Sequence, residues 1–166
     1  MKQRLQNLFK KKIYNCCYLF FLGAISSYSL PPYNYFIINF ITFSLLFIFI
    51  FNKKKKMSNN NFFFQYGWCF GFGYFLFSLY WVVISLTFDS SFKFLIPLAI
   101  ILLPAFLATF YGLITYLFSA FYSKNVVSSF LIFSVLFGIL EFVRGFIFTG
   151  FPWNLISFSF SKNIYF

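Results

Sequence analysis

The stretch that decides the fold runs from Glu141 to Asn154 and reads EFVRGFIFTGFPWN. It places one of the chain's two acidic residues three positions before an arginine, Arg144, inside an apolar run. An ionised side chain at the centre of a bilayer costs about 2.5 to 3.5 kcal/mol, so the two charges are expected to pair on one helix face. Glycine permits a left-handed backbone and proline cannot continue a helix, so the run should break at Gly150 and Pro152. The pattern predicts a membrane helix that ends in a turn at the membrane edge.

The composition around this stretch is that of an integral membrane protein. Hydrophobic residues make up 61% of the 166 residues and charged residues only 9%, which is not the balance of a soluble domain. The net charge of +11 suggests nucleic acid at first, but most basic residues lie in 1–12 and 53–56, beside apolar segments. Both clusters are explained by the excess of Lys and Arg that membrane proteins carry in their cytoplasmic segments. We therefore expect a bilayer as the environment and no nucleic-acid partner.

Apolar runs separated by proline, lysine and asparagine predict an all-α, polytopic transmembrane bundle with about five spans. The domain organisation follows from it: 1–12 is a basic cytoplasmic N-terminus, 13–153 the transmembrane domain and 154–166 a truncated C-terminal tail. The charge asymmetry places the N-terminus in the cytoplasm and the Gly150 to Trp153 turn on the outer side of the membrane. The predicted spans are 13–30, 33–51, 62–86, 97–122 and 126–148.

Small residues and prolines indicate how the spans pack. Gly67, Gly71 and Gly73 lie in the third span, and Gly67 and Gly71 share one helix face, which lets a neighbouring helix approach closely. Pro97 fits the first turn of the fourth span, where its missing N–H is tolerated. Pro104 lies inside the same span and should kink it.

The residue types leave little room for chemistry within the chain. It has no histidine and only three cysteines, all in apolar surroundings, so we expect no metal, no cofactor and no catalytic residue. Cys69 has no cation near it in sequence to favour the thiolate. The Glu141 and Arg144 pair has two interpretations: a lock between helices, or an arginine turned to the interface to hold a lipid phosphate. Trp153 is likewise either a membrane anchor or part of a lipid portal. The residues predicted to lie near lipid are Glu141, Arg144, Thr149, Gly150, Pro152 and Trp153.

Several motifs together resemble the bacterial apolipoprotein N-acyltransferases. The segment 141–145 followed by 148–154 is similar to the E-x-x-R-G and T-G-F-P-W segment of that family. The glycine-rich run 67–74, the Leu79-Tyr80-Trp81 triplet, Pro97 and the Pro31-Pro32 turn are similar to its membrane region. The resemblance implies a membrane bundle in a bacterial inner membrane, with the Gly150 to Trp153 turn on the periplasmic side, that carries an external nitrilase-like domain with a Glu, Lys and Cys triad. There the Cys takes an acyl chain from a phospholipid as a thioester and passes it to the α-amine of a diacylglyceryl-cysteine lipoprotein.

The resemblance covers essentially the whole chain but only the front part of the family. None of the residues matches the triad, and Glu141 belongs to the membrane segment. We therefore expect a membrane part, truncated or encoded apart from its catalytic half, that anchors this half, forms the lipid entrance and is inactive alone. Its expected partners are phospholipid, a nitrilase-like catalytic half and lipoprotein substrates. Two alternatives stay open: a non-enzymatic component such as a small transporter subunit, and a gene fragment without function.

Overall fold

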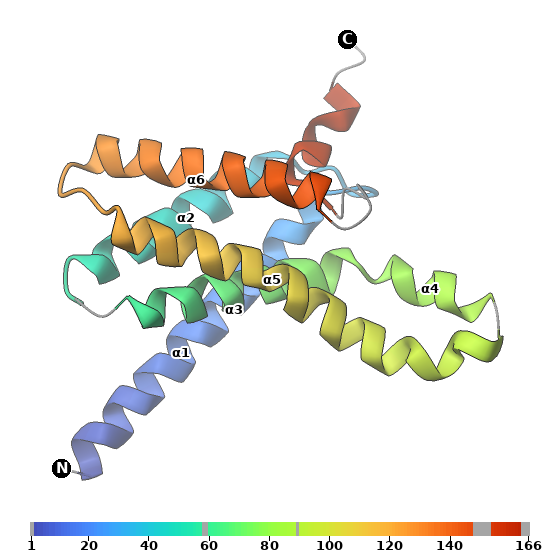
Figure 1. Ribbon diagram of the computed structural model, residues 1–166, viewed down its shortest axis with the longest axis horizontal. Helices are drawn as coiled ribbons and strands as arrows, with labels where there is room; N and C mark the ends of the chain where they lie inside the picture. The colour runs from blue at the N-terminus through green and yellow to red at the C-terminus, as the bar shows by residue number, and fades with distance from the viewer. Residues whose placement is uncertain (1, 58–59, 89, 148–153, 164–166) are drawn as a thin grey trace.

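The computed structural model describes residues 2–57, 60–88, 90–147 and 154–163, and within these ranges it consists of helices and their connections (Figure 1). The all-α fold predicted from the sequence is confirmed. Short 3-10 segments lie at Ser27–Ser29, at Ser90–Leu95 and at η3, Ile156–Asn163. The α-helices are α1 (Lys2–Ser26), α2 (Ile37–Lys54), α3 (Asn61–Ser78), α4 (Trp81–Thr87), α5 (Ile96–Ala120) and α6 (Val126–Phe146).

The basic segments gather at one end of the bundle. Figure 1 shows the N-terminus, the α2–α3 connection and the α5–α6 connection on the same, left-hand side. Lys12 Nζ lies 5.2 Å from the centroid of the Phe62 ring, which brings α1 to the start of α3. Lys54 Nζ donates to Asn60 Oδ1 at 2.6 Å across the α2–α3 connection. This one-sided arrangement is what the positive-inside pattern requires.

Three helical segments among the described residues are long and apolar enough to cross a membrane on their own: Ile37–Lys54, Lys93–Ala120 and Val126–Phe146. The predicted number of about five spans is therefore approximate. The two other predicted spans correspond to α1 and α3, which carry more polar sequences. In α3, Asn61 and Gln65 and several glycines lower the hydropathy. This helix packs between α1 and α5, so neighbouring helices cover most of its surface and it needs less apolar side chain toward lipid.

The third predicted span, 62–86, is divided into two helices. α3 ends at Ser78, and Leu79 (φ −102°, ψ 14°) leaves the helical conformation before α4 begins at Trp81. The carbonyl of Ser78 accepts a hydrogen bond at 2.8 Å from Asn154 Nδ2, a residue far along the chain. Because the hydrogen-bond partner of this terminal carbonyl comes from a residue far along the chain, the sequence near Ser78 gives no sign that the helix ends there.

Glycines allow α3 to approach α1 and α5 closely. A Cβ atom at Gly67 would overlap the Tyr111 carbonyl and the Thr115 side chain of α5, and one at Gly73 would overlap the Phe20 carbonyl of α1. Gly71 lies against Tyr111 in the same way. Thr115 Oγ1 donates to the Phe63 carbonyl at 2.6 Å, a hydrogen bond that only such a close approach permits.

Pro97 and Pro104 take the places in α5 that the sequence predicts. Pro97 lies in the first turn, and Pro104 is buried inside the helix. Near Pro104 the Trp68 indole of α3 donates to the Ala105 carbonyl at 3.1 Å, so a neighbouring helix covers this part of α5.

Asn125 caps the first turn of α6. Its backbone is extended, and its Oδ1 accepts from the N–H groups of Val127 at 2.9 Å and Ser128 at 3.4 Å. Asn125→Ala is expected to lower the free energy of unfolding by about 1 kcal/mol, because these N–H groups lose their partner. Asn125→Asp keeps the acceptor and should restore most of this loss. SDS-induced unfolding followed by circular dichroism measures both variants; equal losses in the two would contradict the cap as the cause.

Candidate functional site

The acidic and basic residues of α6 form an ion pair at the end of the helix. Arg144 Nη2 lies 2.6 Å from Glu141 Oε1, so the i,i+3 pairing expected from the sequence is present. Both side chains project from the last two turns of α6, which ends at Phe146. Glu141 keeps a small exposed fraction, whereas Arg144 is only 1% exposed.

The guanidinium group of Arg144 lies over aromatic rings from two other helices. Its central carbon, Cζ, lies 4.8 Å from the centroid of Phe75 in α3 and 6.0 Å from that of Tyr111 in α5. A guanidinium over the face of an aromatic ring is stabilised by the negative charge of the π system, more strongly where water is excluded. Arg144 therefore points into the bundle. Of the two interpretations drawn from the sequence, this orientation agrees with a lock between helices, because the two rings stabilise the charge inside the protein.

The segment after α6 is fastened to the same pair. Glu141 Oε2 accepts from the backbone N–H of Ile156 at 3.0 Å, so the two carboxylate oxygens serve two different partners. The Asn154 carbonyl accepts from Tyr74 Oη at 3.2 Å and from Arg144 Nη2 at 3.5 Å. We call Glu141, Arg144, Tyr74 and Asn154 the polar knot.

Asn154 closes the polar knot onto the end of α3. Its backbone is left-handed (φ 41°), a conformation that asparagine tolerates better than most residues. Its side-chain amide donates to the carbonyl of Ser78, the last residue of α3. The polar knot thus joins α3 and α6 to the segment that leads into η3.

The other predicted site residues fall into two groups. Thr149, Gly150, Pro152 and Trp153 lie outside the described residues. Gly67 and Gly71 lie against α5 and Gly73 against α1.

The sequence alone does not single out Tyr74, Phe75 or Tyr111 as site residues. Tyr74 is the last residue of the glycine-rich run and Phe75 directly follows it, and such a run is only a weak signal for a packed helix face. Tyr111 has no signal beyond its aromatic type, since it reaches the site from a different helix. The sequence indicates that Arg144 needs stabilising groups from other helices, but it does not show which residues provide them.

The chemistry of the polar knot suits attachment of chain segments. Its carboxylate, phenol and amide bind one another or backbone groups, and the guanidinium binds through Nη2 alone, with Nε and Nη1 buried beside aromatic rings. Cys69 is a free thiol in α3, nine residues before Ser78 and so about 13 Å along the helix. The described residues therefore define a helical membrane protein in which a buried ion pair fixes the segment that follows its last long helix.

Comparison with known proteins places this membrane protein in a family. The model of the apolipoprotein N-acyltransferase N-terminal domain matches residues 22–166, and the chain belongs to this family. The chain is 38% identical over 142 residues to the apolipoprotein N-acyltransferase of Rhizobium rhizogenes, an alignment that covers 82% of this chain and 26% of that protein. For the proteins of the same name from Brucella melitensis and Agrobacterium fabrum, the identities are 35% over 146 residues and 36% over 142. These alignments cover 84% and 82% of this chain, and 27% of each relative. The chain thus spans about a quarter of the length of the curated relatives it matches.

Proposed function

We propose that the chain acts as the membrane domain of an apolipoprotein N-acyltransferase. In this role it anchors and orients a catalytic part at the periplasmic face of the inner membrane and forms the entrance for the phospholipid that donates the acyl chain. The observation that carries the proposal is the family match across residues 22–166. The acceptor would be the diacylglyceryl-cysteine of a lipoprotein, and a nitrilase-like part would supply the catalytic residues.

The polar knot supports the anchoring part of the proposal. It fixes the position of the segment that begins at Asn154, because Asn154 and Ile156 are each hydrogen-bonded to groups that are themselves held by packed helices. A domain attached after a membrane helix keeps a defined orientation only if the segment that connects it to the helix is held in place. The last two turns of α6, which carry the pair, lie at the end of this helix farther from the α5–α6 connection (Figure 1), and the predicted topology makes that end of α6 the periplasmic one.

A replacement experiment tests the proposal. The 166-residue chain replaces the matching first quarter of the Rhizobium rhizogenes relative, in a bacterium depleted of its own enzyme. Mass spectrometry of a reporter lipoprotein then measures N-acylation. We expect the fusion protein to restore N-acylation and the 166-residue chain alone to give none.

Two outcomes would contradict the proposal in different ways. A fusion protein that inserts in the membrane at normal level but leaves the reporter unacylated would argue against the role as a membrane domain. N-acylation by the purified chain alone would place catalysis within it and overturn the assignment of a purely supporting role. Measuring the amount of inserted protein by immunoblot keeps the first outcome distinct from poor expression.

A further inference from the structure

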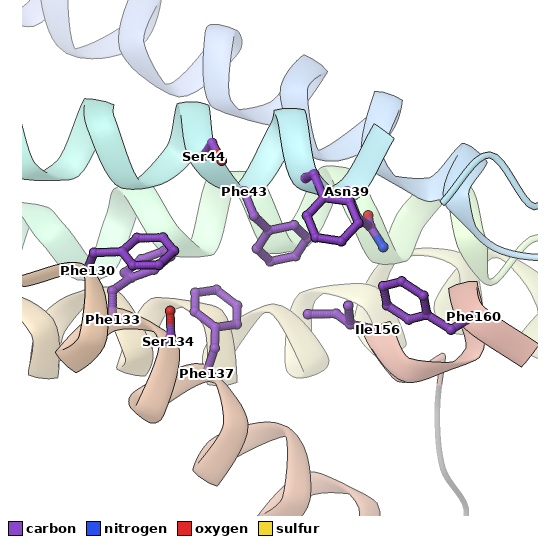
Figure 2. Close-up of a pocket in the computed structure, with 10 residues that line it drawn as sticks. Asn39, Phe43, Ser44, Phe130, Phe133, Ser134, Phe137, Ile156 and Phe160 are labelled. Carbon is purple, nitrogen blue, oxygen red and sulfur yellow. The ribbon is translucent and has the colours of Figure 1, made fainter. Parts of the chain in front are cut away.

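A pocket lies between α2 and α6, and residues of η3 also line it. Its volume is about 270 Å³. Figure 2 shows the rings of Phe43 from α2 and Phe137 from α6 pointing toward one another, with Phe130 and Phe133 toward one end. We call this pocket the α2–α6 groove.

The floor of the α2–α6 groove consists of aromatic rings packed against one another. The centroids of Phe43 and Phe137 lie 5.2 Å apart in an edge-to-face arrangement, and Phe137 also contacts Tyr111 at 5.3 Å. The rim is open, since Phe40 and Phe130 are about half exposed. The floor therefore belongs to the packed core, while the rim faces whatever surrounds the bundle.

Polar groups close one end of the α2–α6 groove. Asn39 Oδ1 accepts from Ser26 Oγ at 2.8 Å, and Asn39 Nδ2 donates to Ser159 Oγ of η3 at 3.2 Å. These groups satisfy one another at the end of α2 that is remote from the tetralysine segment. The remainder of the lining is apolar except for the small side chains of Ser44 and Ser134.

The dimensions of the α2–α6 groove decide what can occupy it. Its lining runs from residue 39 to 44 on α2 and from 130 to 137 on α6, which corresponds to about 8 and 10 Å of helix. A membrane-spanning helix is about 10 to 12 Å wide, whether it belongs to a second copy of this chain or to another protein. To pack along the bundle it needs a contact surface that extends through the hydrocarbon core, which is about 30 Å thick. The pocket is too small and too short for a helix. It matches one slender apolar chain that reaches part of the way into one leaflet.

We propose that the α2–α6 groove binds one acyl chain of a glycerophospholipid, with the lipid headgroup beyond the Asn39 end. The inference rests on the proposed function, since it names where a phospholipid lies in the membrane domain. An apolar groove open to hydrocarbon is filled by hydrocarbon, because water finds no polar partners along the aromatic floor. Both helices that form its walls are among those apolar enough to face lipid.

Photolabelling of the full chain in lipid nanodiscs tests the proposal. The probe is a phosphatidylethanolamine with a diazirine in the middle of one acyl chain, and mass spectrometry locates the adducts. We expect adducts concentrated on Phe43, Phe133 and Phe137, and fewer on Ile139, an exposed residue on another face of α6. Equal labelling of the groove and of Ile139 would overturn the proposal, because the lipid would then be only part of the general bilayer.

Matched variants show whether the groove itself is responsible. Ser134→Trp fills the groove and should abolish most of the labelling at Phe43 and Phe137, and Ser44→Trp should do so from the opposite wall. Val135→Trp adds the same bulk at a neighbouring position that is 58% exposed and outside the lining, so labelling should persist. Unchanged groove labelling in a folded Ser134→Trp or Ser44→Trp protein would overturn the proposal. The labelling needs no catalysis, so a failed replacement experiment with intact groove labelling would refute the acyltransferase role alone.

Discussion

Replacing Arg144 with alanine is expected to lower the free energy of unfolding by about 3 to 5 kcal/mol, the cost of removing one partner from a buried ion pair. The substitution leaves Glu141 inside the bundle without its cation and removes the guanidinium from the faces of Phe75 and Tyr111. It also removes one donor to the Asn154 carbonyl, so the segment after α6 loses part of its attachment. SDS-induced unfolding in mixed micelles measures the stability loss. Phe142→Ala is the matched control, because Phe142 lies between the pair in sequence but is 67% exposed.

A double variant separates the charge effect from the positioning effect. Glu141→Leu with Arg144→Leu removes both charges, and replacing a buried pair with apolar residues often restores stability. We expect the double variant to recover most of the loss of Arg144→Ala. In the fusion protein it should still reduce N-acylation, because Ile156 and Asn154 lose their hydrogen bonds to the pair. Full acylation by the stable double variant would show that the pair only stabilises the bundle and does not position the segment after α6.

The ion pair shows how much of the site the sequence predicts. Unpaired charges are costly in an apolar helix, and side chains three residues apart lie close enough to pair. The contact between Glu141 and Arg144 could therefore be predicted from the sequence alone. The direction of Arg144 did not follow, because it depends on rings in α3 and α5 that are distant in sequence. The role of Asn154 was equally hidden: its amide ends α3 at Ser78 through a contact between residues 76 positions apart.

The helices show the same division between local and distant causes. Pro97 acts locally, and α5 begins at Ile96, beside the residue that predicts its start. The basic cluster 1–12 does not mark a helix start in this way, because α1 begins at Lys2, eleven residues before the predicted span. The prediction of one continuous helix for the third span was wrong, because no residue near Leu79 indicates a break in the helix. α3 has a lower hydropathy than the three candidate spans, because a helix packed between α1 and α5 can carry glycine and tyrosine in buried positions.

The same substitution at two glycines should change stability in opposite directions. In α3, a Cβ at Gly73 would overlap the Phe20 carbonyl of α1, and α1 contributes the reciprocal close contact at Gly23, against the Phe70 carbonyl. The neighbouring atoms are backbone and cannot rotate away, so α1 and α3 must separate. In α6, a Cβ at Gly138 would meet nothing within 4 Å.

Gly73→Ala is therefore expected to lower the free energy of unfolding by about 1 to 3 kcal/mol, the usual cost of overpacking a tight contact. Gly138→Ala should raise it by up to about 1 kcal/mol, because alanine is the better helix former and has room there. SDS-induced unfolding under identical conditions compares the two variants with the parent chain. A loss of similar size at both positions would mean that helix propensity or membrane insertion governs the result and not the approach of α1 to α3. Opposite signs would identify this glycine contact as the feature that fixes α3 at the centre of the bundle, and thereby places Tyr74 and Phe75 against Asn154 and Arg144.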